Sequence, residues 1–206
     1  MLHNQSLGSL EIVARSASNL KDVETGGKND AYAQFSLNIK DAKSFQKTKT
    51  HKNAGANATW DQTIVLEGAP DEHRVLYVEV MEEDFGADAP IGFTAIRLDQ
   101  IQSGPVSGHF DLFTPDGKQK GEISLNLRFL GNAAQSGHGA SNVRGRGELL
   151  NEHQKRVKGL KSKETAQDVG VALGAGLAAL GAAYLLGGGD KKKTEAEKGD
   201  AAVANH

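Results

Sequence analysis

The sequence predicts an all-β fold, an eight-stranded antiparallel sandwich that occupies residues 1–131. Two observations carry this prediction. Residues 7–130 contain about eight runs rich in β-formers, spaced regularly and separated by polar loops with glycine, as in antiparallel sandwiches. Residues 9–15 and 122–129 alternate apolar and polar side chains, so each run should bury one face. A domain of this length can fold around its own core.

The predicted strands follow one another through short connections. The fifth run is rich in β-formers and bounded by polar residues, which predicts a mostly buried strand. The eight ranges are 8–15, 31–39, 45–50, 59–66, 75–81, 91–98, 109–113 and 121–129.

The composition changes after residue 131, and four further segments are predicted. Residues 132–147 are rich in glycine and serine, which is typical of a flexible linker. Residues 148–168 carry a helical apolar pattern among lysines and arginines, which predicts a basic amphipathic helix. Residues 169–189 carry no charge, and residues 190–206 indicate a disordered charged tail.

Composition narrows the class of protein. Residues 1–131 hold 13 Lys and Arg against 18 Asp and Glu, whereas residues 132–206 hold 11 against 8, so an acidic domain precedes a basic tail. The absence of cysteine excludes disulfides and thiolate sites and fits a reducing compartment. Residues 1–6 lack the pattern of a secretory signal. We therefore expect a cytoplasmic protein, and the segments described below add membrane association to this expectation.

An acidic loop follows the fifth predicted strand. Residues 82–88 contain four carboxylates and Phe85 without a basic residue. Clustered carboxylates repel one another unless a positive charge lies among them. Carboxylate oxygens are the ligands that a hard cation such as calcium prefers. A second acidic loop, residues 19–30, precedes the second predicted strand.

Several short motifs in order resemble one known family. They are Ala17-Ser18-Asn19-Leu20 after the first strand, Gly26-Gly27-Lys28-Asn29-Asp30-Ala31-Tyr32, Thr59-Trp60-Asp61-Gln62, Glu82-Glu83-Asp84 with Ile91-Gly92, and the closing run 121–127. Together they resemble a C2 domain, the eight-stranded sandwich whose loops bind calcium and phospholipid. The strand order along the chain resembles its type II topology.

The resemblance implies a calcium (Ca2+) site at the two acidic loops. The implied ligands are Asp22, Glu24, Asp30, Glu82, Asp84 and Asp88. Two of these positions hold Glu where the family usually has Asp. The added methylene moves the carboxylate by roughly 1.5 Å, which is a large shift compared with calcium–oxygen distances of about 2.3–2.6 Å. The alternative is a solvated loop face, as in family members that have lost calcium binding.

The resemblance also implies two kinds of membrane contact. Val23 and Phe85 stand at the loop tips and would enter the acyl region, the alternative being that Phe85 folds back over its own loop. A basic patch of Lys43, Lys47, Lys49 and Lys52 would bind anionic lipid. Its alternative is an ordinary solvated strand face.

The uncharged segment 169–189 has the length needed to span a bilayer. Drawn as a helix, its residues 169–186 place small side chains on one face and leucines on another, which suits packing between membrane helices. The predictions are a tail anchor, an interfacial or self-associating helix, or a flexible Gly/Ala stretch.

Three classes of function follow. The first is a non-enzymatic, calcium-dependent phospholipid-binding module that acts as a peripheral or tail-anchored membrane adaptor. The second is a calcium-independent adaptor that binds protein partners. An enzyme is the third and least favoured, because no phosphate loop, Gly-x-Ser-x-Gly elbow or metal-spaced histidine pair is present in the sequence. No nucleic-acid partner is expected.

Overall fold

The computed structural model of the chain describes residues 8–24, 26–67, 75–101, 104–130, 141–144 and 147–161. The chain divides into a unit of Met1–Gln167 and a unit of Asp168–His206. The described residues all belong to the first unit, so the predictions for segments 169–189 and 190–206 lie outside them.

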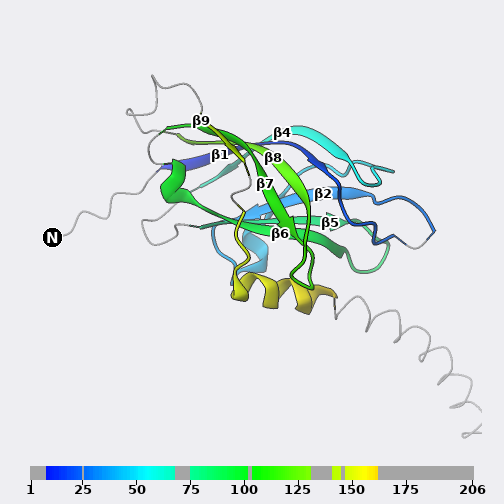
Figure 1. Cartoon of the computed structure of the whole chain (residues 1–206). Coiled ribbons are helices and arrows are strands. Elements are labelled where there is room, and N and C mark those ends of the chain that lie inside the picture. The colour runs from blue at the N-terminus through cyan, green and yellow to red at the C-terminus, as the bar shows by residue number, and fades with distance from the viewer. Residues whose placement is uncertain are drawn as a thin grey trace, which may run out of the picture. The chain divides into compact units, whose positions relative to one another are not determined.

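The described part of the first unit consists mainly of β-strands (Figure 1). Eight of them match the eight predicted runs, which confirms the predicted antiparallel sandwich. Their bounds are β1 Ser9–Ser18, β2 Ala31–Ser36, β3 Gln46–Lys47, β4 Ala58–Leu66, β5 Val75–Glu82, β6 Ala89–Arg97, β7 Val106–Phe113 and β8 Gln119–Leu130. A ninth strand, β9, covers Ser141–Arg144, two 3-10 turns cover Ala42–Ser44 and Leu98–Ile101, and residues 151–161 form an α-helix.

The strand order in the sheet is β3-β2-β5-β6-β7-β8-β1-β4. The sheet folds into two halves of four strands each, β3-β2-β5-β6 and β7-β8-β1-β4. β6 and β7 share one residue pair, Phe93 with Phe113, whereas β5 and β6 pair along their whole length. The sheet therefore bends at the β6–β7 boundary. β8, the last of the eight strands, lies between β1 and β7, which confirms the type II topology that the resemblance implied.

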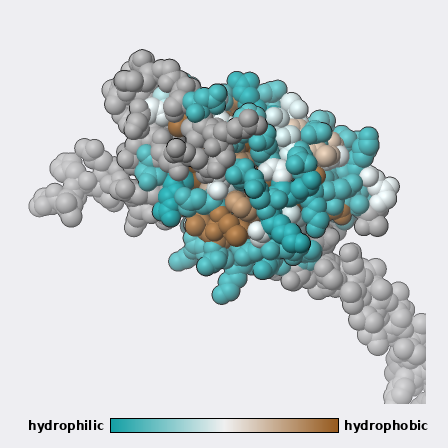
Figure 2. Space-filling model, in the orientation of Figure 1, coloured by the Kyte–Doolittle hydropathy of each residue, from teal (hydrophilic) through white to brown (hydrophobic). Residues whose placement is uncertain are grey.

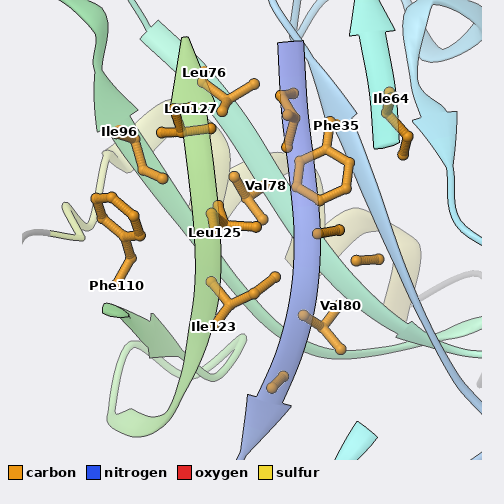
Figure 3. Packing of buried hydrophobic residues seen from close by; sticks show 14 of the residues in the cluster. Phe35, Ile64, Leu76, Val78, Val80, Ile96, Phe110, Ile123, Leu125 and Leu127 are labelled. Atoms are coloured by element: carbon orange, nitrogen blue, oxygen red, sulfur yellow. The ribbon is translucent and has the colours of Figure 1, made fainter. Parts of the chain in front are cut away.

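The core lies between the two halves and is formed by alternate side chains of the strands. Leu76, Val78 and Val80 project inward from β5 and are completely buried. Phe35 of the neighbouring strand β2 and Leu125 of β8, in the other half, are buried in the same core cluster (Figure 3). Because each buried side chain removes apolar surface from water, the alternation fixes which face of each strand points inward.

The described part of segment 132–147, for which the composition predicts a linker, includes a short strand. Ser141–Arg144 forms β9, which pairs in parallel with Val106–His109 of β7. Glu148 then pairs with Ala95 of β6 through two backbone hydrogen bonds of 3.0 and 2.9 Å. We call β9 together with Glu148 the strap, since they pair with both strands that flank the bend. Backbone pairing needs no apolar side chain, so a Gly/Ser-rich composition did not reveal it.

Residues 151–161 are helical, within the range 148–168 predicted as a basic amphipathic helix. The helix lies on the outer face of the β2-β5-β6 half (Figure 1). His153 and Val157 are completely buried there. The His153 ring packs edge-on against the rings of Tyr77 and Phe93, at centroid distances of 5.2 and 4.7 Å. The apolar side of this helix is therefore covered by the sandwich.

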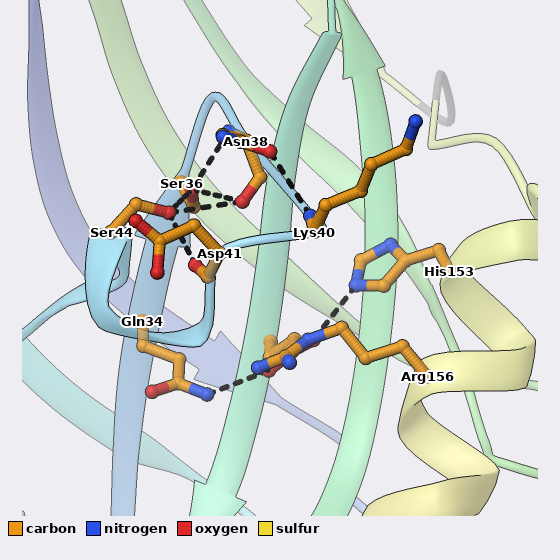
Figure 4. Close-up of polar contacts among 9 residues, drawn as sticks. Gln34, Ser36, Asn38, Lys40, Asp41, Ser44, His153 and Arg156 are labelled. Atoms are coloured by element: carbon orange, nitrogen blue, oxygen red, sulfur yellow. Dashed lines mark hydrogen bonds and ion pairs between the residues drawn. The ribbon is translucent and has the colours of Figure 1, made fainter.

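A buried carboxylate holds the helix to the sheet. Glu79 of β5 is completely buried and accepts hydrogen bonds from Gln34 (2.6 Å) and Arg156 Nε (2.9 Å), and it lies 3.2 Å from His153 Nε2. His153 and Arg156 point from the helix toward the sheet (Figure 4). The Arg156 guanidinium also lies 4.3 Å from the centre of the Phe45 ring, where it gains a cation–π contact.

The surroundings of Glu79 favour its ionised form. Burial alone raises the pKa of a carboxyl group, but the hydrogen bonds from His153 and Arg156 outweigh it and hold the pKa of Glu79 below its ordinary 4.5. A lowered pKa in the folded state stabilises the fold above pH 4.5. That stabilisation is lost as the pH falls through the folded-state pKa.

We expect Arg156→Ala to destabilise the full chain by roughly 3 kcal/mol, because a buried carboxylate loses its main cation. Urea unfolding at pH 7 measures this free energy. Arg97→Ala is the control, since its half-exposed pair with Glu148 should contribute at most about 1 kcal/mol. The difference in unfolding free energy between Arg156→Ala and the parent should narrow as the pH falls through the lowered folded-state pKa of Glu79, because the protonated carboxyl group no longer needs a cation. Equal losses in the two variants would contradict the assigned role of Glu79.

Candidate functional site

Three loops meet at one end of the sandwich. They are residues 19–30 between β1 and β2, residues 48–57 between β3 and β4, and residues 83–88 between β5 and β6. Backbone hydrogen bonds join Leu20 to Ala56 (3.0 Å) and Glu83 to Asp30 (2.9 Å). The structure therefore brings together both predicted acidic loops and adds a third loop to them.

Asp30 and Glu82 lie at the centre of this loop cluster. The pairing of Ala31 in β2 with Glu82 in β5 puts the two residues side by side, and the Asp30 N–H donates to Glu82 Oε2 at 2.6 Å. Glu82 is 3% exposed, and its Oε1 is buried without a hydrogen-bond partner among the described residues. Burial, together with the neighbouring Glu24 carboxyl group, raises the pKa of Glu82 to about 7. Glu24 and Glu82 are thus two carboxyl groups that face each other.

Asp84 and Asp88 shape the loop after β5. The Asp84 N–H donates to Asp88 Oδ1 at 3.3 Å, and the Phe85 N–H donates to Asp84 Oδ1 at 2.6 Å. Asp88 Oδ2 accepts a hydrogen bond from the Tyr32 hydroxyl at 2.6 Å. Burial and this bond raise the pKa of Tyr32. Both aspartates thus take part in local bonds that order the loop.

A lysine occupies one side of the loop cluster. Lys52 Nζ donates to Asp30 Oδ2 at 3.0 Å and to Glu83 Oε2 at 2.7 Å. The pKa of Asp30 is lowered by the Asn53 N–H, which reaches Oδ1 at 2.7 Å, and by Lys52. Lys52 also lowers the pKa of Glu83, and the two carboxylates raise the pKa of Lys52. Lys52, predicted as a lipid-binding residue, is a counter-cation of the acidic loops in this structure.

A buried asparagine holds the first loop in shape. Asn29 is completely buried and donates to the backbone carbonyls of Lys21 (2.9 Å) and Gly55 (3.0 Å). Its Oδ1 accepts from the Val23 N–H at 3.1 Å. Asn29 lies in the Gly-Gly-x-Asn-Asp motif of the sequence, but the sequence analysis assigned it no role. Asp22 is exposed and accepts from the Glu24 N–H at 3.3 Å, so it bonds within its own turn.

The two predicted insertion residues differ in position. Phe85 is fully exposed, with a relative accessibility of 107%. Val23 is partly buried and packs against the core. The structure therefore leaves Phe85 at the tip of its loop and turns Val23 inward.

Three of the predicted basic residues lie away from the carboxylates. Lys43, Lys47 and Lys49 are exposed. Lys47 Nζ lies 4.8 Å from the centre of the Tyr32 ring on the outer face of the β2–β3 pair. β3 ends at Lys47, so Lys49 lies in the loop beyond the strand rather than on the predicted strand face. Figure 2 shows one mainly hydrophilic face of the molecule with a small apolar patch.

Glu24, Asp30 and Glu82 bring carboxylate groups to the same loop cluster, and carboxylate oxygens are the type of ligand that calcium prefers. Within the residues that the structure describes, no group of three or more His, Cys, Asp or Glu side chains is arranged to hold a metal ion. The unpartnered Glu82 oxygen fits a cation at this point, whereas the Lys52 ammonium holds Asp30 and Glu83 on the other side.

A family model described as C2 domain matches residues 8–112, just over half of the chain. The chain belongs to the C2 domain family. The strap and the 151–161 helix follow the matched residues along the chain.

Two plant proteins are among its relatives. The chain is 30% identical over 131 residues to "Protein SRC2 homolog" and 32% identical over 130 residues to "Calcium-dependent lipid-binding protein", both from Arabidopsis thaliana. Each match covers 59% of this chain, but only 40% and 25% of the respective relative. This C2 chain therefore spans less than half of the length of either relative.

Solved C2 domains share the fold. A C2 domain of plant Extended Synaptotagmin 1 matches with a TM-score of 0.51 and 17% identity, over 60% of this chain and 95% of that one. A calcium-bound structure of the paired C2 domains of Extended Synaptotagmin 2 matches with a TM-score of 0.51 and 20% identity, over 61% of this chain and 46% of that one. At these identities the likeness concerns the fold alone.

We expect Glu82→Gln to remove part of the pH dependence of stability in the presence of chelator. A carboxyl group whose pKa is raised in the folded state stabilises the fold below its ordinary 4.5, and this contribution is lost as the pH rises to about 7. The amide cannot ionise, so the variant should lose less thermal stability between pH 5 and pH 8 than the parent does. Glu83→Gln is the control, because the pKa of Glu83 is lowered. Parallel Tm profiles for Glu82→Gln and the parent would contradict this account of Glu82.

Proposed function

We propose that this C2 domain is a non-enzymatic, calcium-dependent module that binds anionic phospholipid and acts as a peripheral or tail-anchored membrane adaptor. The observation that carries the proposal is the fully exposed Phe85 among the carboxylates of its loop. Burial of an exposed aromatic side chain in another apolar surface gains free energy. One relative bears the name "Calcium-dependent lipid-binding protein", which supports the same chemistry.

The acidic loops would hold calcium through carboxylate oxygens. The proposed ligands are Glu24, Asp30, Glu82, Asp84 and Asp88, with Asp22 at the edge of the group. When bound, the ion supplies positive charge that offsets the repulsion between these carboxylates and anionic headgroups. Phe85 can then enter the interface, where burial of a Phe side chain contributes roughly 1.5–3 kcal/mol.

Of the two residues predicted to insert into the membrane, only one is exposed enough to do so. We assign insertion to Phe85, because Val23 already packs against the core. Lys43, Lys47 and Lys49 are exposed and can approach anionic lipid, at about 1 kcal/mol for each base near the surface.

The C-terminal tail provides the second part of the proposal. Among the residues that the structure describes, no helix is long and apolar enough to cross a bilayer. Segment 169–189 lies outside those residues, so its role as an anchor, and self-association through the small side chains of 169–186, rest on the sequence.

A calcium-independent protein-binding adaptor is the second candidate function. The observation that favours it is the Lys52 ammonium, which already neutralises part of the negative charge of Asp30 and Glu83. In that case the loops would be stable without a metal ion, and their surface would be available to a protein partner.

We expect Phe85→Ala to weaken the binding of the full chain to phosphatidylserine vesicles about tenfold, since a loss of about 1.4 kcal/mol is tenfold in affinity. Asp84→Asn should abolish the calcium dependence of the same binding. Co-sedimentation with calcium and with chelator measures both effects.

Two matched variants control this experiment. Leu149→Ala removes the other exposed large apolar side chain of the described residues, and Asp99→Asn neutralises an exposed acid beyond the far end of β6. Neither should change vesicle binding by more than about twofold, because neither lies in the loop cluster. If Phe85→Ala and Asp84→Asn bind as the parent does, the loop mechanism is wrong.

We expect the tail to retain the protein on membranes without calcium. After expression with its tail, the full chain should stay in the membrane pellet through carbonate extraction, because an uncharged segment of 21 residues is long enough to span. A chain that ends at residue 168 should be released. Release of the full chain as well would show that segment 169–189 does not span the bilayer.

A further inference from the structure

The Lys52 ammonium lies among the carboxylates of the loop cluster. It lies between Asp30 Oδ2 (3.0 Å) and Glu83 Oε2 (2.7 Å), one from each acidic loop. It comes from the third loop, residues 48–57, which the acidic motifs do not include. A positive charge of the chain itself therefore joins the two acidic loops.

Lys52 competes directly with metal binding by Asp30. Both oxygens of that carboxylate are occupied, Oδ1 by the Asn53 N–H at 2.7 Å and Oδ2 by Lys52. A calcium ion bound to Asp30 Oδ2 would lie close to the Lys52 ammonium, and the two positive charges would repel each other, so Lys52 opposes calcium binding by this carboxylate.

On the other side of the loop cluster, the buried Glu82 carboxyl group has no hydrogen bond from a basic side chain among the described residues. Glu82 is 3% exposed, its Oε2 accepts from the Asp30 N–H, and its Oε1 is buried without a partner in the described part of the chain. Lys52 bonds to Asp30 and Glu83 rather than to Glu82, and the Glu82 carboxyl group faces that of Glu24. Two carboxylates that face each other repel when both are ionised, so a cation bound beside them would relieve that repulsion.

The Lys52 ion pairs are of the kind that exchanges easily. The Lys52 side chain is 58% exposed, and its partners Asp30 and Glu83 are 26% and 35% exposed. Water screens such pairs, and a flexible four-carbon stem lets the ammonium move away without a change in the backbone. Lys47 and Lys49 lie a few residues earlier in the chain and are exposed to solvent.

We propose that Lys52 is a tethered counter-cation, which calcium must displace from Asp30 and which then joins Lys47 and Lys49 in contact with anionic lipid. This inference rests on the proposed calcium-dependent function. Lys52 lowers the intrinsic affinity of the loops for calcium, and its release adds a positive charge to the lipid-facing surface. Because coupling is reciprocal, anionic lipid that binds the released Lys52 raises the affinity for calcium by the same factor.

Calorimetric titration of the full chain with calcium chloride, without lipid, tests the displacement. Lys52→Gln should bind calcium about threefold to tenfold more tightly than the parent, as expected for the removal of two exposed ion pairs. Lys49→Gln is the matched control and should stay within about twofold of the parent. Thermal unfolding of each variant in chelator verifies that it folds.

The outcomes separate this inference from the proposed function. If parent and Lys52→Gln bind calcium equally, the displacement is wrong and the calcium function stands. If all three proteins give flat titrations, the calcium function itself is wrong, and the inference falls with it. Binding by Lys52→Gln alone would support displacement in its strongest form, in which Lys52 keeps calcium out.

A second measurement follows Lys52 itself. Acetylation of lysine side chains by a soluble reagent, read by mass spectrometry, should modify Lys52 several-fold faster in calcium than in chelator, since a side chain released from two carboxylates is more open to the reagent. Lys49 in the same molecule serves as the internal reference. An unchanged ratio of the two rates at saturating calcium would overturn the proposal.

Discussion

The register between β2 and β5 is the constraint on which the loop cluster depends. Ala31, the first residue of β2, lies opposite Glu82 in this antiparallel pair. Asp30, the residue before Ala31, therefore lies at the end of the strands beside Glu82 and Glu83. A shift of one residue would turn every side chain of β5 to the other face, taking Val78 and Val80 out of the core. Core packing therefore fixes the position of the carboxylates, even though the core residues themselves are apolar.

β5 also shows how position alone decides the behaviour of a carboxyl group. Glu79 and Glu82 are both buried on this strand and lie three positions apart in the sequence. Burial is opposed at Glu79 by hydrogen bonds from His153 and Arg156, which lower its pKa, whereas Glu82 faces other acids and has a raised pKa. The first carboxylate binds the helix to the sheet, and the second is left in need of a positive charge. Two chemically equal side chains on one strand thus have pKa values shifted in opposite directions by their surroundings.

Much of the fold could be predicted from the sequence, because alternation and turn residues are local signals. The eight strands were recognisable in this way, and the meeting of Asp30 with Glu82 followed from the family resemblance. β9 was missed, since a strand held by backbone bonds in a polar segment has no apolar pattern. The helix was predicted as basic and amphipathic, but its packing on the sandwich was not, because helical periodicity identifies an apolar side and not the surface that covers it. The sequence also could not place Lys52 between the acidic loops, because that contact joins residues from three loops through side chains alone.

The strap has a consequence for association between molecules. Without β9, Val106–His109 of β7 would present unpaired backbone N–H and C=O groups at a bend of the sheet, and Ala95 of β6 would lose its bonds if Glu148 were absent. Exposed strand edges are templates for pairing with another chain, so proteins cover them, charge them or keep them short. Here the cover is supplied by the chain's own continuation beyond the sandwich. The strap therefore guards the domain against edge-to-edge aggregation, a task that leaves no trace in side-chain chemistry.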